Sequence, residues 1–207
     1  PLGQALARLG LDADDIGAVS IHGTSTEAND LNETALHNTM AHALGRTAGN
    51  PLPIIAQKAL TGHAKGGAAA WQLNGLMQAM RDGIIPPMRN LEEPDRRLDD
   101  REFLVYPDAP IEVGAGQLRA GLVTSLGFGH VGAAVCVAHP DVLLETLSKK
   151  ALSAYASRRD ARWRQRLTTQ NEVLLGERLL MEQRTERPLT EAGEKALLLD
   201  PNGRIDS

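Results

Sequence analysis

The chain has 207 residues, a length that fits about one globular domain and an additional segment. Hydrophobic residues make up 42% of the sequence and charged residues 23%, which excludes an intrinsically disordered chain. The net charge of −4 argues against a nucleic-acid partner. No apolar run approaches the ~18 residues that a membrane-spanning helix needs, so we expect no membrane partner either.

The single cysteine, Cys136, excludes an internal disulfide framework and a multi-cysteine zinc site. His37 and His42 lack the spacing of a known metal motif, so no metal site is predicted. A reducing, cytoplasmic compartment is the natural expectation, and no secretory leader is visible over residues 1–11. Because the chain begins with Pro1, we expect a processed chain, an excised piece or an ordered fragment.

The first fifty residues predict a helix, a strand and a second helix. A helix over residues 2–9 is stopped by Gly10, and the apolar run 16–21 predicts a buried strand that ends at His22. Next come side-chain oxygens suited to an N-cap, then acidic residues in the first turns of a helix that Gly45 can close.

The remaining elements up to residue 140 indicate an α/β layer. Residues 52–56 form a second apolar strand, and the helix that follows ends at Gly83. An edge strand is predicted at 103–106, and the runs 118–126 and 133–138 predict a hairpin around a glycine-rich turn. This order implies helices on a mixed sheet, for which we expect five strands.

From Asp141 onward the composition changes, so we divide the chain into 1–140 and a helical tail or linker, 141–207. Residues 143–186 are helical in pattern and rich in arginine around Trp163. A nucleic-acid-binding helix is one interpretation. Interleaved acidic residues favour a solvated or interface helix instead.

Two histidines occupy matching places. His22 ends one strand and His63 lies at a strand-to-helix junction, and ligands bind at strand ends in α/β sheets. A neutral imidazole at such a place can donate a hydrogen bond to a developing oxyanion, although each histidine could also be a structural cap. Lys58 ends the second apolar strand, which indicates either a buried lysine with a task or one that reaches solvent.

The run Gly127-Phe128-Gly129-His130-Val131-Gly132 has the letters of a dinucleotide fingerprint, but a strand rather than a helix follows it. The glycines are better explained by a sharp turn that presents the backbone N–H of Phe128. Cys136 lies within the following strand and is interpreted as a structural thiol.

Three ordered blocks carry a family resemblance: 22–26 with Asp30 and Glu33, then 58–63, then 127–129. With these blocks, residues 1–140 resemble the β-ketoacyl synthase family, whose fold is thiolase-like. The stretches 44–51, 70–75 and 123–129 are most similar to the synthase domain of the multifunctional type I fatty acid synthases of the fungal and mycobacterial type. The resemblance implies the C-terminal half of that domain.

The resemblance further implies a decarboxylative Claisen condensation between an acyl thioester on a cysteine and a malonyl thioester on an acyl carrier protein. His22 and His63 would stabilise the enolate oxygen, and Lys58 would orient and tune them. Phe128 would supply an oxyanion-hole N–H and act as the gate between the acyl and malonyl sites.

Substrate binding and partners follow from the same resemblance. Thr24 and Thr26 would hydrogen-bond the pantetheine arm, and Gly127 and Gly129 would complete the substrate-binding turn. No cofactor is expected to bind directly, because the substrates are carried on the phosphopantetheine arm of the acyl carrier protein. The expected partners are that carrier domain, the N-terminal half of the synthase domain and a second synthase in a dimer.

The sequence departs from the family in three places. No cysteine precedes His22, and Cys136 is in the wrong position to replace the nucleophile, so we expect this chain to be inactive alone. The acid that many relatives carry on the helix after the second histidine aligns with Gln72, and the polar residues usual after the glycine turn are absent. A non-catalytic acyl-binding or assembly module and a malonyl decarboxylase remain as alternatives.

Overall fold

The computed structural model describes two compact units, Pro1–Ser148 and Lys149–Ser207. The residues it describes are 1–127, 129, 131–181 and 190–199. All strands of this described part lie in the first unit. The first unit therefore contains the sheet on which any strand-end site must be built.

The sheet has five strands in the order β4-β2-β1-β6-β7. Their bounds are Ile16–Ser20 (β1), Leu52–Ile55 (β2), Leu104–Val105 (β4), Ala120–Gly127 (β6) and Val131–Ala138 (β7). The first four strands are parallel, and β7 pairs antiparallel with β6 as a hairpin. The mixed sheet and the hairpin expected from the sequence are confirmed. A separate antiparallel pair joins β3 (Ile84–Ile85) to β5 (Ile111–Glu112).

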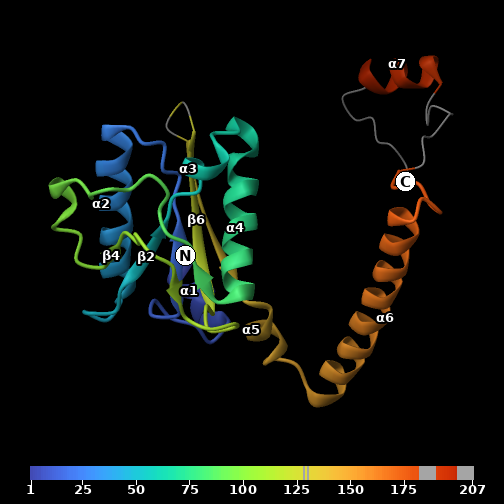
Figure 1. Ribbon diagram of the computed structural model, residues 1–207, viewed down its shortest axis with the longest axis horizontal. Coiled ribbons are helices and arrows are strands. Elements are labelled where there is room, and N and C mark those ends of the chain that lie inside the picture. The colour runs from blue at the N-terminus through green and yellow to red at the C-terminus, as the bar shows by residue number, and fades with distance from the viewer. Residues whose placement is uncertain (128, 130, 182–189, 200–207) are drawn as a thin grey trace. The chain divides into compact units, whose positions relative to one another are not determined.

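Helices cover both faces of the sheet (Figure 1). Helices α1 (Leu2–Arg8) and α2 (Glu27–Leu44) pack on one face, and α4 (Ala68–Asp82) packs on the other. Because side chains alternate along a strand, Val19 of β1 joins the first apolar cluster and its neighbour Ala18 joins the second. The two apolar clusters therefore pack on opposite faces of the central strands.

The carboxyl ends of β1, β2 and β6 lie at one edge of the sheet, because these strands are parallel. Residues 22, 58 and 127 therefore come to the same edge. One detail of the sequence interpretation is wrong. Strand β2 ends at Ile55, and Lys58 begins a one-turn helix, α3 (Lys58–Thr61), which is followed by the short 3₁₀ helix η1 (Lys65–Gly67).

The tail is helical, as expected. Helix α5 (Pro140–Leu144) belongs to the first unit and buries Val142, while α6 (Lys149–Leu174) and α7 (Glu191–Leu199) belong to the second. Helix α6 has no buried residue in the described structure. The helix break expected at Pro188 lies outside the described residues, and the domain boundary at 140/141 stays a prediction.

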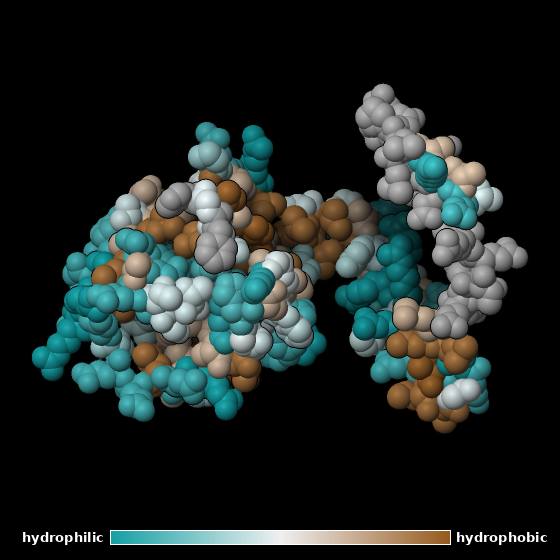
Figure 2. Space-filling view, turned by 90° about the horizontal axis from the view of Figure 1, so that it is seen from above, coloured by the Kyte–Doolittle hydropathy of each residue, from teal (hydrophilic) through white to brown (hydrophobic). Residues whose placement is uncertain are grey.

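The surface of the first unit is partly apolar. Figure 2 shows hydrophobic side chains (brown) exposed among hydrophilic ones. Leu60, Trp71 and Val131 are exposed by 70%, 52% and 69%. None of the helices in the described ranges is long and apolar enough to cross a membrane. Exposed apolar side chains such as Leu60, Trp71 and Val131 are candidates for a protein interface.

Two helix-ending glycines provide a matched test of the packing. Gly45 and Gly83 both adopt positive φ, +78° and +68°, after α2 and α4. A Cβ at position 83 would lie 2.0 Å from the carbonyl carbon of Gly114, whereas one at position 45 would meet no described atom within 4 Å.

We expect Gly45→Ala to lower the free energy of unfolding by about 1 kcal/mol, the usual cost of the left-handed conformation. Gly83→Ala should cost about 3 kcal/mol or more, because a backbone clash adds to that cost. Urea unfolding followed by circular dichroism measures both. Equal losses would contradict the close approach of the Gly83 and Gly114 backbones.

Candidate active site

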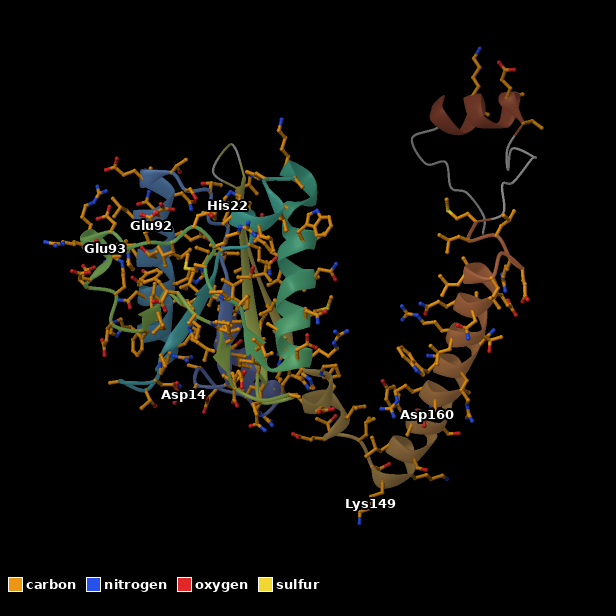
Figure 3. The ribbon with its side chains drawn as sticks, viewed as in Figure 1. Asp14, His22, Glu92, Glu93, Lys149 and Asp160 are labelled. Atoms are coloured by element: carbon orange, nitrogen blue, oxygen red, sulfur yellow. The ribbon has the colours of Figure 1, made fainter. Side chains whose placement is uncertain are left out.

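The two histidines selected from the sequence lie side by side. His22 follows the end of β1, at the opposite end of the sheet from Asp14 (Figure 3). The ring centroids of His22 and His63 are 5.4 Å apart, and the ring planes meet at 84°. His22 is buried and His63 is exposed. The structure therefore brings the two imidazole rings together at one edge of the sheet, as the sequence predicts.

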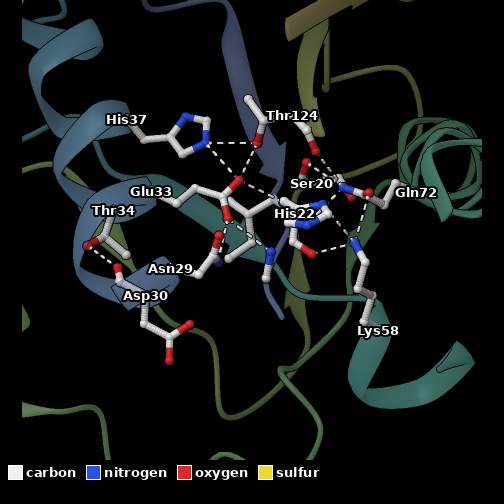
Figure 4. Close-up of polar contacts among 12 residues, drawn as sticks. Ser20, His22, Asn29, Asp30, Glu33, Thr34, His37, Lys58, Gln72 and Thr124 are labelled. Atoms are coloured by element: carbon white, nitrogen blue, oxygen red, sulfur yellow. Dashed lines mark hydrogen bonds and ion pairs between the residues drawn. The ribbon is translucent and has the colours of Figure 1, made fainter. Parts of the chain in front are cut away.

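Lys58 is held at this pair by three acceptors (Figure 4). Its Nζ donates to the backbone carbonyl of His22, lies 3.4 Å from Nδ1 of the same ring and donates to Oε1 of Gln72 at 3.1 Å. An ammonium group has three N–H donors, so this arrangement uses all of them. Burial lowers the pKa of Lys58, and the Glu33 carboxylate opposes that shift. The side chain is therefore a half-buried, fully hydrogen-bonded amine.

The environment of His22 favours its neutral form. Burial is the largest effect that lowers its pKa; Lys58 and His63 add to the decrease, and Glu33 opposes it. Because the Lys58 amine donates toward Nδ1, the proton of the neutral ring belongs on Nε2. His22 can therefore donate a hydrogen bond through Nε2 without carrying a charge.

A different donor occupies Nδ1 of His63. Its Nδ1 accepts a hydrogen bond from the backbone N–H of Lys65 at 3.1 Å, at the start of η1. A neutral ring with an accepting Nδ1 carries its proton on Nε2. The two histidines therefore offer two matching N–H donors from two different loops.

Glu33 has a role that the sequence interpretation missed. The sequence places Glu33 in the first turns of a helix, which is where it lies in α2. Its carboxylate is buried beneath the site rather than exposed at the end of the helix. It accepts backbone N–H bonds from His22 at 2.7 Å and Gly23 at 2.9 Å, and side-chain bonds from Asn29 and Thr124 at 3.0 and 2.6 Å. Glu33 lies eleven residues after His22 in the same sequence block, and this proximity is the feature from which a contact could have been predicted.

The hydrogen bonds keep this buried acid ionised. Burial alone would raise the pKa of Glu33, but His37, whose Nε2 lies 3.9 Å away, and hydrogen bonds from Gly23, Thr124 and His22 outweigh burial and lower the pKa to about 2. His37 completes the cluster, fully buried with Nε2 3.1 Å from the Thr124 hydroxyl.

The other predicted site residues are placed as follows. The hydroxyls of Thr24 and Thr26 lie 3.3 Å apart, and Thr26 is the N-cap residue of α2 without a side-chain capping bond. The expected cap oxygen is thus not used. Gly127 ends β6 and Gly129 has a φ of +79°. Phe128 lies outside the described residues.

Cys136 lies away from the histidines. It pairs with Leu122 in the hairpin and packs against the apolar cluster, and burial raises the pKa of its thiol. This is the environment of a structural thiol rather than of a nucleophile. No group of three or more metal-ligating side chains occurs in the part of the chain that the structure describes.

Comparisons with known proteins show which sequences the chain is similar to. Residues 2–92 match the family model of the β-ketoacyl synthase C-terminal domain. "Fatty acid synthase 2" of Mycosarcoma maydis is 41% identical over 207 residues, which is 100% of this chain and 6% of that protein. The fatty acid synthase subunit alpha of Saccharomyces cerevisiae is 38% identical over 205 residues, 99% of this chain and 11% of the yeast protein.

Solved structures show the same fold. An oxazolomycin ketosynthase domain of Streptomyces albus superposes with a TM-score of 0.57 at 25% identity, over 67% of this chain and 24% of that one. A bacillaene ketosynthase of Bacillus subtilis superposes with a TM-score of 0.56 at 19% identity, over 63% of this chain and 24% of that one, and this similarity shows the fold alone.

The mixed sheet, with histidine-bearing loops at the ends of its strands, is thus the thiolase-like architecture of ketosynthases. The chain carries a β-ketoacyl synthase C-terminal domain over residues 2–92, and its whole length is similar to fungal fatty acid synthases, which confirms the resemblance seen in the sequence. The chain spans only 6% to 13% of the length of the curated relatives it matches.

The ionised Glu33 makes a prediction about stability. A carboxyl whose folded pKa is about 2, against 4.5 unfolded, contributes about 3 kcal/mol at most, present above about pH 4.5 and lost as the pH falls toward about 2. We expect Glu33→Gln to lower the free energy of unfolding at neutral pH and to remove that pH-dependent contribution.

Urea unfolding of both proteins at neutral and acid pH provides the measurement. Glu92→Gln is the matched control, because the same change at an exposed position should leave stability unchanged. A Glu33→Gln protein as stable as the unmodified chain at neutral pH would show that the buried carboxylate is not required.

Proposed function

We propose that this chain supplies the two histidine donors of a 3-oxoacyl-[acyl carrier protein] synthase, an acyltransferase of fatty acid biosynthesis. The observation that carries the proposal is the pair of imidazoles with ring centroids 5.4 Å apart, each with Nδ1 occupied by a donor. Two Nε2–H groups can then converge on one oxygen atom. Such an arrangement stabilises negative charge where it develops.

The reaction that fits is decarboxylative condensation. The bond between the malonyl α-carbon and its carboxylate breaks, carbon dioxide leaves, and the electron pair forms an enolate whose oxygen accepts bonds from His22 and His63. The α-carbon then attacks an acyl thioester and expels the cysteine thiolate. Neutral donors suit this reaction, because the charge on the enolate oxygen exists only along the reaction path.

The remaining site residues take supporting roles in this proposal. Lys58 orients His22 and keeps its pKa low. Thr24 and Thr26 hydrogen-bond the pantetheine arm that carries the substrate, and no cofactor binds directly. Gly127 and Gly129 allow the turn at which the backbone N–H of residue 128 completes the oxyanion hole for the acyl thioester.

The nucleophilic cysteine and the partners are proposed to come from outside residues 1–207. The exposed apolar side chains of Leu60, Trp71 and Val131 offer surface to an N-terminal half of the synthase domain or to a second synthase in a dimer. The substrates arrive on an acyl carrier protein, and the working compartment is the cytoplasm. Curated relatives of this chain are fatty acid synthases, which supports this assignment.

A malonyl decarboxylase is the second candidate, favoured by the position of the only cysteine. Cys136 lies in the hairpin rather than beside the histidines. An enzyme with the two histidines and no nucleophile would release carbon dioxide from a malonyl thioester without lengthening an acyl chain. Measurement of both products therefore separates the two functions.

The histidines provide the direct test. In an active synthase that contains this chain, we expect His22→Ala and His63→Ala each to reduce acyl elongation about 100-fold or more, because each removes an oxyanion donor. His42→Ala, on the exposed side of α2, should leave elongation unchanged. Undiminished elongation by either site variant, measured with acyl and malonyl carrier-protein thioesters, would refute the assignment.

The cysteine provides an independent test. We expect the 207-residue chain alone to acquire no acyl group from an acyl carrier-protein thioester, because the Cys136 thiol is half-buried with a raised pKa. Intact mass spectrometry after incubation measures this. Stoichiometric acylation that disappears in Cys136→Ser would overturn the conclusion that the nucleophile lies elsewhere.

A further inference from the structure

Gln72 contacts both the sheet edge and Lys58 with one side chain. It lies on α4, is only 1% exposed, and reaches from the helix to the edge where the histidines lie (Figure 4). Its amide nitrogen lies within hydrogen-bond distance of three backbone carbonyls, those of Ser20 at 3.1 Å, Ile21 at 2.6 Å and Thr124 at 2.9 Å, so its two N–H groups serve three acceptors and one hydrogen is shared. Ser20 ends β1, Ile21 follows it directly, and Thr124 lies within β6.

These contacts fix which way the amide points. Carbonyl oxygens only accept hydrogen bonds, so the three of them require the NH₂ end of Gln72. The amide oxygen must therefore face the opposite side, where Lys58 Nζ donates to it at 3.1 Å. The orientation follows from the neighbours and leaves no alternative flip.

The amide oxygen of Gln72 is the third hydrogen-bond acceptor of the Lys58 amine. Two of the lysine's three acceptors belong to His22 itself, its carbonyl and its Nδ1. Gln72 supplies the third, from a different element. Without it the amine would have no contact that ties it to α4, and its position relative to the His22 ring would depend on His22 alone.

A carboxylate of the same size would not fit this place. One of its oxygens would lie at 2.6 to 3.1 Å from three carbonyl oxygens, with no hydrogen to share. Buried acceptors left facing one another lose their hydrogen bonds and repel. An ionised glutamate at position 72 is thus incompatible with the carbonyl groups around the amide nitrogen.

We propose that Gln72 is a positioning residue of the site: its amide nitrogen joins the end of β1 to the middle of β6, and its amide oxygen places Lys58 against Nδ1 of His22. The inference rests on the proposed function, because the effect of Gln72 on the position of Lys58 is measured through the rate of condensation. Gln72 touches no substrate, so its removal acts on catalysis through Lys58 and His22.

The test uses an active synthase containing this chain and two near-isosteric variants. Gln72→Met removes both ends of the amide, and Gln72→Glu replaces only the NH₂ end. We expect each to lower kcat about 10-fold or more with little change in KM, in line with the loss of buried hydrogen bonds. Gln78→Glu, the same change on the exposed side of α4, should match the unmodified enzyme.

The pH profile separates positioning from a purely structural role. The titratable groups near Gln72 and its partners are Lys58 from α3, His22 and His63 from the two loops, and Glu33 from α2. Lys58 lowers the pKa of His22. If Gln72→Met lets the amine move away, His22 protonates at higher pH and the acid limb of kcat shifts upward.

Gln72→Glu should lose activity relative to the unmodified enzyme as the pH rises. The new carboxyl can donate to one carbonyl while it is protonated and repels all three once it ionises. Activity of Gln72→Glu equal to or above that of the unmodified enzyme across the neutral range would overturn the inference. An unshifted acid limb in Gln72→Met would also overturn it. Circular dichroism confirms that the variants are folded at the assay temperature.

His22→Ala in the same assay distinguishes two kinds of failure. If His22→Ala keeps full elongation, the proposed function is wrong and the positioning role falls with it. If His22→Ala is inactive while both Gln72 variants behave like the unmodified enzyme, the function stands and only the role of Gln72 is refuted.

Discussion

The geometry of the site depends on one buried carboxylate. Glu33 lies beneath the turn that follows β1 and accepts the backbone N–H groups of His22 and Gly23. Burying an unpaired carboxylate would be strongly unfavourable, so its four hydrogen-bond donors are what make the position tolerable. The same bonds fix the backbone from which the His22 ring projects. Stability and ring placement therefore have a common origin.

The charges around His22 are arranged to keep the ring neutral. The amine of Lys58 lies on its Nδ1 side, and the Glu33 carboxylate binds its backbone rather than its ring. The opposite arrangement, with the carboxylate against the ring, would favour imidazolium and create an ion pair before the reaction begins. A neutral donor next to a cation makes its strongest interaction only when an oxyanion forms.

The sequence predicted what depends on short-range pattern. Apolar runs located β1 and the β6–β7 hairpin, and the rule that ligands bind at strand ends selected His22 and His63, whose rings lie together although His63 follows α3 rather than a strand. The sequence did not predict hydrogen bonds between side chains and partners that lie far apart along the chain. Gln72 bonds Ser20, 52 residues away, and Glu33 bonds Thr124, 91 residues away, and no periodicity encodes such contacts.

The two histidines differ in how much of their environment this chain controls. His22 is 7% exposed, and its surroundings, from Glu33 to Lys58, are built entirely from described residues of the first unit. His63 is exposed, and the one hydrogen bond that sets its polarity comes from the backbone of Lys65. The side-chain contacts that position a ring are therefore found on the His22 side, where Lys58 contacts both Gln72 and His22. On the His63 side, desolvation has to come from whatever covers the ring. In the proposed reaction, a substrate or protein surface over the exposed imidazole would strengthen its hydrogen bond to the enolate oxygen, since hydrogen bonds to a developing charge strengthen as water is excluded.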